Sequence, residues 1–333
     1  MTHENPVLAE VIRSGFAESR HRGAIAVVDS DGTIIQSAGA VNVPIFPRSS
    51  NKPMQAVAML SCGLDLDGEL LALAAASHSG EDFHVTGARK ILADAGLTED
   101  ALHCPPDLPL DERAQREVLL AGGDKERIYM NCSGKHAAML ATCVAAGWPT
   151  ASYTDPGHPL QAEIRHTIER LGRGRGEVGG EQVTVPPGVD GCGAPLFALS
   201  LTGLARAFGA LVQADPGSPE RRVADAMRAH PAWTSGRARA DRRLVQAVPG
   251  LLLKSGAEGV EGLALAGGRA AALKIDDGDG ARRARIAVAV ALLRAIGADD
   301  LPGTDRAVLD ELARPAVYGG GRVVGEVRVK LPF

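Results

Sequence analysis

Four short stretches of the chain, together with one separate lysine, contain the side chains that could do chemistry. The first reads Arg-Ser-Ser-Asn-Lys-Pro over residues 48–53 and places the Ser49 hydroxyl three residues before the Lys52 amine. Ser and Asn just before an apolar run are typical of a helix start, where the two side chains would share one face. A serine hydroxyl becomes a good nucleophile only beside a base. The spacing therefore predicts Ser49 as nucleophile and Lys52 as base, although a helix cap beside a solvated charge is the commoner origin of such a pattern.

Lys52 can act as a base only when it is uncharged. An unperturbed lysine has a pKa of about 10.4, so burial or a second cation nearby must lower it. Lys254 could be that second cation, because it ends an apolar run, although a lysine in that position often extends to solvent instead.

Ser77 lies in another polar stretch, residues 76–82, which also follows an apolar segment. Taken alone, that stretch is better explained as a helix cap or turn.

The remaining stretches place two cysteines beside glycines in expected turns. They read Asn-Cys-Ser-Gly-Lys-His over 131–136 and Asp-Gly-Cys-Gly over 190–193. Two thiolates and a neutral lysine, from Cys132, Cys192 and Lys135, could hold Zn²⁺ with a fourth position open. Lysine is an uncommon ligand, because the metal must displace its proton. Two buried thiols or one disulfide would explain the same cysteines.

The elements that must position these residues alternate between strands at the chain ends and helices in the middle. The pattern predicts an α+β fold, with an antiparallel sheet built from both termini and flanked by helices. It also predicts one domain over residues 1–333, with a Gly-rich surface loop over residues 170–181. The expected strands are 24–28, 33–37, 262–266, 270–275 and 322–330, and the expected helices are 53–60, 87–95, 135–146 and 281–296.

Composition excludes several classes of function. The net charge is −4 and aromatic residues make up 3% of the chain, which argues against a nucleic-acid partner. The longest apolar run, 286–293, is too short to cross a membrane. The first residues lack a basic region followed by an apolar stretch, so no signal peptide is expected and a cytoplasmic location is predicted. A homodimer is the expected assembly.

Taken together and in order, these motifs resemble the thermolabile L-asparaginase II family, the rhizobial-type class 3 L-asparaginases. The resemblance implies a serine β-lactamase-like fold and hydrolysis of L-asparagine to L-aspartate and ammonia. It implies two Ser–Lys pairs, Zn²⁺ on two cysteines and a lysine, and further polar residues that bind substrate. The residues that match are Ser49 with Lys52, Ser77 with Lys254, the zinc ligands Cys132, Lys135 and Cys192, and the substrate-binding residues Arg48, His136 and Asp190.

The chain departs from that family near the site. A cysteine of the rhizobial members has no counterpart here, and Asp241 is the nearest match. The hypothesis is that Ser49 attacks the side-chain amide, Lys52 takes its proton and Ser77 relays protons between the two lysines. The alternatives are a glutaminase or other small-amide hydrolase, a β-lactamase or penicillin-binding-type serine hydrolase, and a zinc-stabilised binding module without activity.

Overall fold

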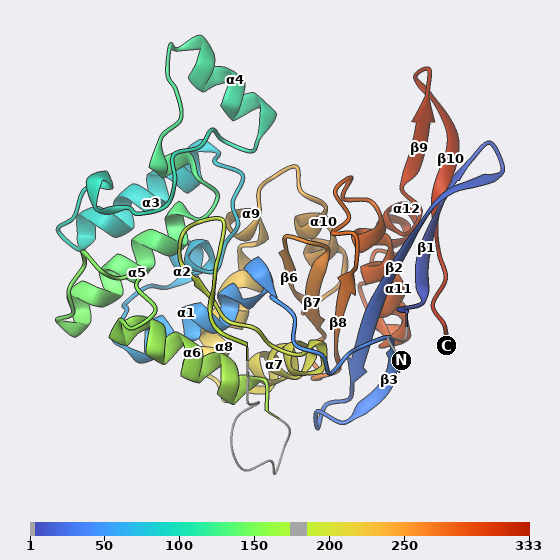
Figure 1. Cartoon of the computed structure of the whole chain (residues 1–333), viewed down its shortest axis with the longest axis horizontal. Coiled ribbons are helices and arrows are strands. Elements are labelled where there is room, and N and C mark those ends of the chain that lie inside the picture. Colours follow the sequence, from blue (N-terminus) through green and yellow to red (C-terminus); the bar gives the residue numbers. More distant parts are fainter. Residues whose placement is uncertain (1–3, 174–184) are drawn as a thin grey trace.

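Strands from the two ends of the chain form one antiparallel sheet, as the sequence predicts. The computed structural model describes residues 4–173 and 185–333 (Figure 1). The strand order is β6-β7-β8-β2-β1-β10-β9, with β3 paired to β2, and all pairs are antiparallel. The strands of this sheet are β1 (Val7–Arg13), β2 (Phe16–Val28), β3 (Ile34–Ala38), β6 (Leu252–Gly256), β7 (Val260–Ala264), β8 (Ala270–Ile275), β9 (Ala316–Gly319) and β10 (Arg322–Val329).

The two predicted hairpins are present. In the first, β2 and β3 pair from Ile25↔Ala38 to Val28↔Ile34, and Gly32 takes the positive φ of +85° that the turn between them requires. In the second, β7 and β8 pair from Val260↔Lys274 to Ala264↔Ala270, on either side of the Gly-Gly turn. Turn residues and the strand-forming residues beside them were therefore sufficient to predict both hairpins.

Helices cover both faces of the sheet, as Figure 1 shows. Along β2, Ala26 and Val28 face one apolar core while Ile25 and Val27 face the other, which is the alternation expected of a strand buried on both sides. The first core contains α1 (Lys52–Ser61), α2 (Gly68–Ala74), α3 (Asp82–Asp94), α5 (Ser133–Ala146), α6 (Pro159–Leu171), α7 (Leu201–Gln213) and α8 (Pro219–Ala229). The second contains α10 (Ala240–Ala247), α11 (Ala284–Ala295) and α12 (Arg306–Ala313).

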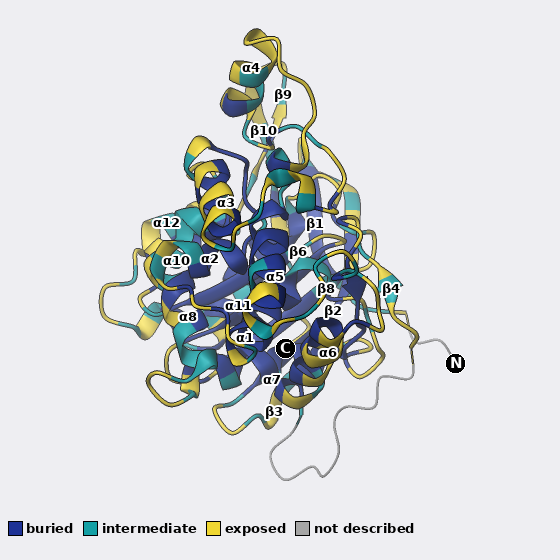
Figure 2. Ribbon diagram, turned by 90° about the vertical axis from the view of Figure 1, so that its left-hand side faces the viewer, coloured by how far each residue is buried: buried dark blue, intermediate teal, exposed yellow. Residues whose placement is uncertain are grey.

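Shorter elements connect these layers. Figure 2 colours α1 and most of α5 as buried, whereas α4 (Glu112–Leu120) stands away from the body and is mostly exposed. No helix in the described residues is long and apolar enough to span a membrane. The remaining elements are η1 (Arg48–Asn51), η2 (Glu99–Ala101), η3 (Arg127–Tyr129), η4 (Ala298–Asp300), α4 (Glu112–Leu120), α9 (Pro231–Thr234), β4 (Gly188–Val189) and β5 (Pro195–Leu196).

The predicted helices all exist, with their ends shifted by a few residues. α5 ends where expected, because Gly147 adopts the left-handed conformation with φ +68°. Strands β1 and β9 and several helices of the middle region, α7 and α8 among them, were not predicted. Most of the Gly-rich loop expected over 170–181 lies outside the described residues. The single domain and the β-lactamase-like arrangement stay predictions.

The contact between α7 and the sheet yields a prediction about stability. A Cβ on Gly262 would lie 2.3 Å from the ring of Phe208, which is fully buried. We expect Gly262→Ala to lower the free energy of unfolding by roughly 1–3 kcal/mol, because the ring has no room to move. Gly267→Ala is the matched control, since a Cβ there meets no atom within 4 Å. Urea unfolding of both variants measures the difference, and equal stabilities would contradict the tight contact.

Candidate active site

Lys52 is the first residue of α1, and its amine is buried. The residue is 1% exposed. Its Nζ donates to the carbonyl oxygen of Ala76 at 2.5 Å, and lies 2.9 Å from Ser77 Oγ and 3.0 Å from Cys132 Sγ. The amine is therefore held where the chain leaving α2 meets the start of α5.

A second buried amine reaches the same hydroxyl from the sheet. Lys254, on β6, is 3% exposed, and its Nζ lies 3.3 Å from Ser77 Oγ. The same amine donates to the carbonyl oxygen of Ser255 at 2.7 Å. The Ser77 backbone is fixed in turn, because its N–H donates to the carbonyl oxygen of Thr234. One serine hydroxyl thus lies between two lysine amines that come from opposite halves of the chain.

Ser49 lies in η1, one turn before the helix, and not at the helix start that the sequence suggested. Arg48 has a φ of +52°, which is uncommon for a residue with a side chain. The turn packs against the end of β6, where a Cβ on Gly256 would lie only 2.5 Å from the carbonyl oxygen of Pro47. Ser49 Oγ makes no hydrogen bond to another described residue, because the Lys52 side chain turns inward to Ser77.

Ser49 and Ser77 nevertheless open onto one cavity. Its volume is about 280 Å³, which suits a small ligand. Polar and charged side chains line much of it, so a zwitterionic or charged ligand would find partners there. The lining residues are Ser49, Ser77, Leu110, Asn131, Arg239, Ser255, Gly256, Ala257, Glu258, Gly259, Gly278, Asp279, Gly280, Arg282 and Arg285.

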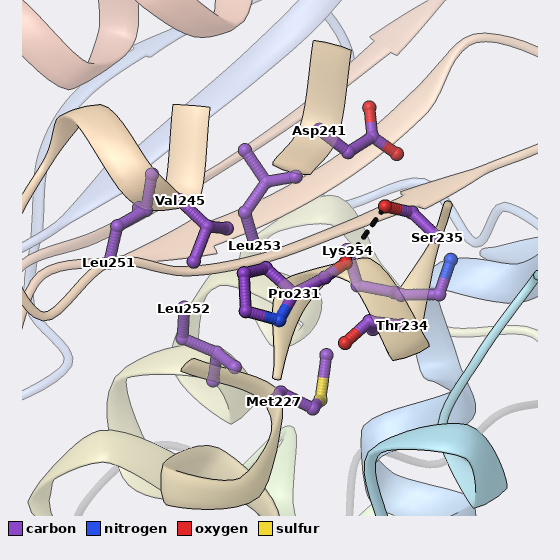
Figure 3. A pocket seen from close by; sticks show the side chains of 10 residues that line it. All are labelled: Met227, Pro231, Thr234, Ser235, Asp241, Val245, Leu251, Leu252, Leu253 and Lys254. Carbon is purple, nitrogen blue, oxygen red and sulfur yellow. Dashed lines mark hydrogen bonds between the residues drawn. The ribbon is translucent and has the colours of Figure 1, made fainter. Parts of the chain in front are cut away.

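The environment of Lys254 makes its uncharged form accessible near neutral pH. Burial, and secondly the nearby Lys52 cation, lower the pKa of Lys254 to about 7, against the opposing attraction of Asp241. Figure 3 shows the apolar side of this environment, where Leu252 and Met227 stand on one wall of a small enclosed space beside Lys254. A neutral amine beside Ser77 is what proton transfer from a serine requires.

The two predicted sulfur ligands also converge with a lysine. Lys135 Nζ lies 3.1 Å from Cys192 Sγ, and Cys132 and Cys192 are hydrogen-bonded to each other as free thiols. That hydrogen bond, with help from the Lys135 cation, holds the pKa of Cys192 far below the usual range although burial opposes it. The same bond and burial raise the pKa of Cys132. Of the two thiols, Cys192 is therefore the one that ionises more readily.

These residues suit a soft divalent metal. No group of three His, Cys, Asp or Glu side chains among the described residues could bind a metal, so a site here needs the Lys135 amine as its third donor. His136 lies beside the sulfurs, with Nδ1 2.7 Å from the Tyr153 hydroxyl and no hydrogen-bond partner for Nε2. Burial, and then the Lys135 charge, lower the pKa of His136 to about 4, so the ring is neutral. The two buried thiols are ligands of the kind that zinc prefers, and the Lys135 amine would be the third donor.

Arg48 and Asp190 join the sulfur side of the site to η1. Arg48 Nε donates to Asp190 Oδ1 at 2.8 Å, and Cys192 Sγ lies 3.4 Å from the other carboxylate oxygen. Arg48 also lies 3.7 Å from the Glu258 carboxylate at the cavity rim. All ten predicted site residues thus lie in one connected region, and Arg48 and Asp190 are held together as an ion pair.

A family model for L-asparaginase II matches residues 9–329. The chain belongs to the L-asparaginase II family. Two sets of crystal structures are similar at a lower level. Mglu, in its tris and glutamate form, shares 16% identity over 89% of this chain, with a TM-score of 0.37, and this chain covers 64% of the length of Mglu. A Bacillus glutaminase shares 13% identity over 76% of this chain and 83% of its own, with a TM-score of 0.32.

At these TM-scores the likeness to the solved structures is too weak to assign the fold. A comparison with curated proteins gave no match. The family assignment therefore rests on the match over residues 9–329, which includes every motif described above.

Sequence reasoning singled out Asp241 only as the nearest match to a missing family cysteine, and it missed the partners of Asp241 in this L-asparaginase II site. Asp241 Oδ2 accepts a 2.5 Å hydrogen bond from Ser255 Oγ, and Arg285 Nη2 lies 3.4 Å from Oδ1. A signal for Arg285 was present, since it is an arginine among the apolar residues that begin helix α11 and therefore needs a buried partner. Tyr153 gave no comparable signal, because its contact with His136 depends on how α5 and the following loop pack.

The buried amine of Lys254 yields a prediction about stability and pH. Its pKa of about 7 lies below the ordinary lysine value of 10.5, so the unfolded chain binds this proton more tightly than the folded protein does. At any pH where the unfolded chain is protonated at this lysine, the folded protein therefore loses stability. That loss is complete below about pH 7 and disappears as the pH rises towards 10.5. We expect Lys254→Met to be more stable than the wild type by roughly 2 kcal/mol or more near pH 6, with a smaller difference near pH 9.

Denaturant unfolding at the two pH values measures this difference. Lys90→Met is the matched control, because Lys90 is exposed and bonds only to Asp94 among the described residues. Its stability difference should be small and nearly independent of pH. A Lys254→Met difference that does not change with pH would mean that this lysine keeps an ordinary pKa.

Proposed function

We propose that this chain hydrolyses the side-chain amide of L-asparagine to L-aspartate and ammonia through a serine acyl-enzyme. Its family assigns it to the amidohydrolases. The main support for a serine acyl-enzyme is the position of the Ser77 hydroxyl between the buried amines of Lys52 and Lys254. Ser49 lines the same cavity. A small polar cavity with two serines and two buried bases supports nucleophilic attack on a small amide.

In this mechanism Ser49 is the nucleophile. Its hydroxyl opens onto the cavity and has no described hydrogen-bond partner, so it is available to a substrate carbonyl carbon. Hydrogen bonds between nucleophile and base are often long without substrate and shorten when it binds, which is how Lys52 would reach the Ser49 proton. Neutral Lys254 first takes a proton from the Lys52 ammonium through Ser77, which leaves Lys52 uncharged. Attack then forms the bond from Ser49 Oγ to the amide carbon and passes the hydroxyl proton to Lys52.

Collapse of the tetrahedral intermediate then breaks the carbon–nitrogen bond. The proton held by Lys52 passes to the departing nitrogen, which leaves as ammonia, and Ser49 carries an aspartyl ester. Ser77 joins Lys52 to Lys254, so either amine can take the proton that water gives up when it cleaves the ester, and that proton then returns to Ser49 Oγ. Backbone N–H groups near η1 would stabilise the oxyanion, at about 3 kcal/mol for each donor.

We further propose Zn²⁺ as a resident metal on Cys132, Cys192 and Lys135. Bound there, it would supply a fixed positive charge that orients the polar groups of the substrate, while serine supplies the nucleophile. Arg48, Asp190 and His136 surround this ligand set and would bind the α-carboxylate and α-amine of the amino acid. A homodimer and a cytoplasmic location stay predictions.

The purified protein tests the substrate directly. We expect ammonia release from L-asparagine, a much lower rate from L-glutamine, and no hydrolysis of the β-lactam nitrocefin. Preincubation with a chelator should lower the asparagine rate, and elemental analysis should find zinc in the wild type but not in Cys192→Ala. A higher rate on glutamine would make the enzyme a glutaminase, and a protein that binds zinc but releases no ammonia would be a binding module.

The roles of the two serines can be separated by two matched variants. Ser49→Ala should abolish the aspartyl ester that mass spectrometry detects on rapidly quenched enzyme, because it removes the oxygen that forms the ester. Ser77→Ala should keep a detectable ester and lower kcat on the order of 10²-fold, because only proton transfer is lost. If Ser77→Ala abolishes the ester while Ser49→Ala only slows its formation, the two roles are reversed.

A further inference from the structure

A buried ionic cluster lies at the wall of the cavity, and the mechanism above does not use it. Asp241 is in the first turn of α10, Glu261 is on β7 and Arg285 is in α11. Arg285 lies 3.4 Å from Asp241 Oδ1 and contacts the Glu261 carboxylate directly. All three side chains are at least nine-tenths buried. Two carboxylates therefore share one guanidinium away from solvent. Removing these charges from water costs free energy, so the cluster calls for a functional explanation.

The second oxygen of Asp241 connects this cluster to the lysines. Ser255 Oγ donates to Asp241 Oδ2 at 2.5 Å, and the carbonyl oxygen of the same serine accepts from Lys254 Nζ at 2.7 Å. Lys254 Nζ in turn lies 3.3 Å from Ser77 Oγ. Asp241 thus fixes the residue whose carbonyl oxygen determines where the Lys254 amine lies.

Asp241 is also the one anion that acts strongly on Lys254 among the described charges around it. Lys52 approaches Lys254 from α1, Arg239 from the segment before α10 and Arg285 from α11, and all three are cations. Glu261, on the neighbouring strand, is paired with Arg285. Figure 3 shows Asp241 and Lys254 lining the same small enclosed space.

We propose that Asp241 is a positioning residue that acts in two ways on the general base Lys254. Through Ser255 it holds the Lys254 amine against Ser77, and its negative charge offsets the three cations that surround that amine. This inference rests on the proposed function, because it assigns Lys254 a role in proton transfer. Asp241 itself does not line the cavity and is not expected to touch the substrate.

The two effects make different predictions for two variants. Asp241→Asn keeps the shape and the acceptor for Ser255 but removes the charge. Without that anion, the Lys254 ammonium loses its compensating partner and its pKa falls further below about 7. The acid limb of kcat/KM for L-asparagine, which reports loss of the neutral base, should therefore move to lower pH on the order of 1 pH unit.

Ser255→Ala removes the link and keeps the charge. We expect kcat to fall roughly tenfold, because the Lys254 amine is less well aligned, while the acid limb stays at its wild-type pH. Asp300→Asn is the control for the chemical change itself, since Asp300 is an exposed carboxylate in η4, and it should leave both kcat and the limb unchanged. A uniform fall in activity for Asp241→Asn, with the limb unmoved, would overturn the charge effect and leave only a structural role.

A second measurement does not depend on enzymatic activity. The stability gain from Lys254→Met depends on pH, and it should begin to decrease at a lower pH in the Asp241→Asn background than in the wild type. The same onset pH in both backgrounds would contradict the inference even if the protein hydrolyses no amide. Conversely, a shifted onset in a protein that releases no ammonia would support the Asp241–Lys254 interaction and reject the proposed function.

Discussion

The site depends on two lysine amines buried on either side of one serine hydroxyl. Two like charges at this separation in a poorly solvated space repel strongly, so the arrangement is stable only if one amine is uncharged. The effect falls on Lys254, whose pKa is lowered to about 7 first by burial and then by Lys52. Burial therefore does more here than protect the site from water, because it creates the base that the serine needs.

The fold supplies this burial by bringing distant segments to one edge of the sheet. β6 is the outermost strand on its side, and η1 and α1 pack against it through the side-chain-free Gly256. The chain leaving α2 then inserts Ser77 between the lysines of α1 and β6. A sheet built from both termini is what allows residues near 50, 77 and 254 to meet, since the helices between them occupy one face.

The sequence was informative where the signal is local and uninformative where it depends on packing. The hairpins and α5 followed from turn and cap residues, and the serines, lysines and cysteines followed from short motifs and a family resemblance. The partner of Lys52 could not be predicted, because Ser49 lies in a 3-10 turn and the lysine side chain turns inward instead. Asp241 gave no local sign of its role, since its contacts with Ser255 and Arg285 come from three separate elements.

The hydrogen bonds and ion pairs of the site form one continuous path. It begins at the Arg48–Asp190 pair, passes through the sulfurs and both lysines, and ends at the buried carboxylates beside Arg285. The successive members are Arg48, Asp190, Cys192, Cys132, Lys52, Ser77, Lys254, Ser255, Asp241, Arg285 and Glu261. Because each buried group relies on its neighbour for charge or hydrogen bonding, the free energies of changes along this path should not be additive. A substitution of Asp241 therefore acts on Ser77 by altering charge and position, without contact with the substrate.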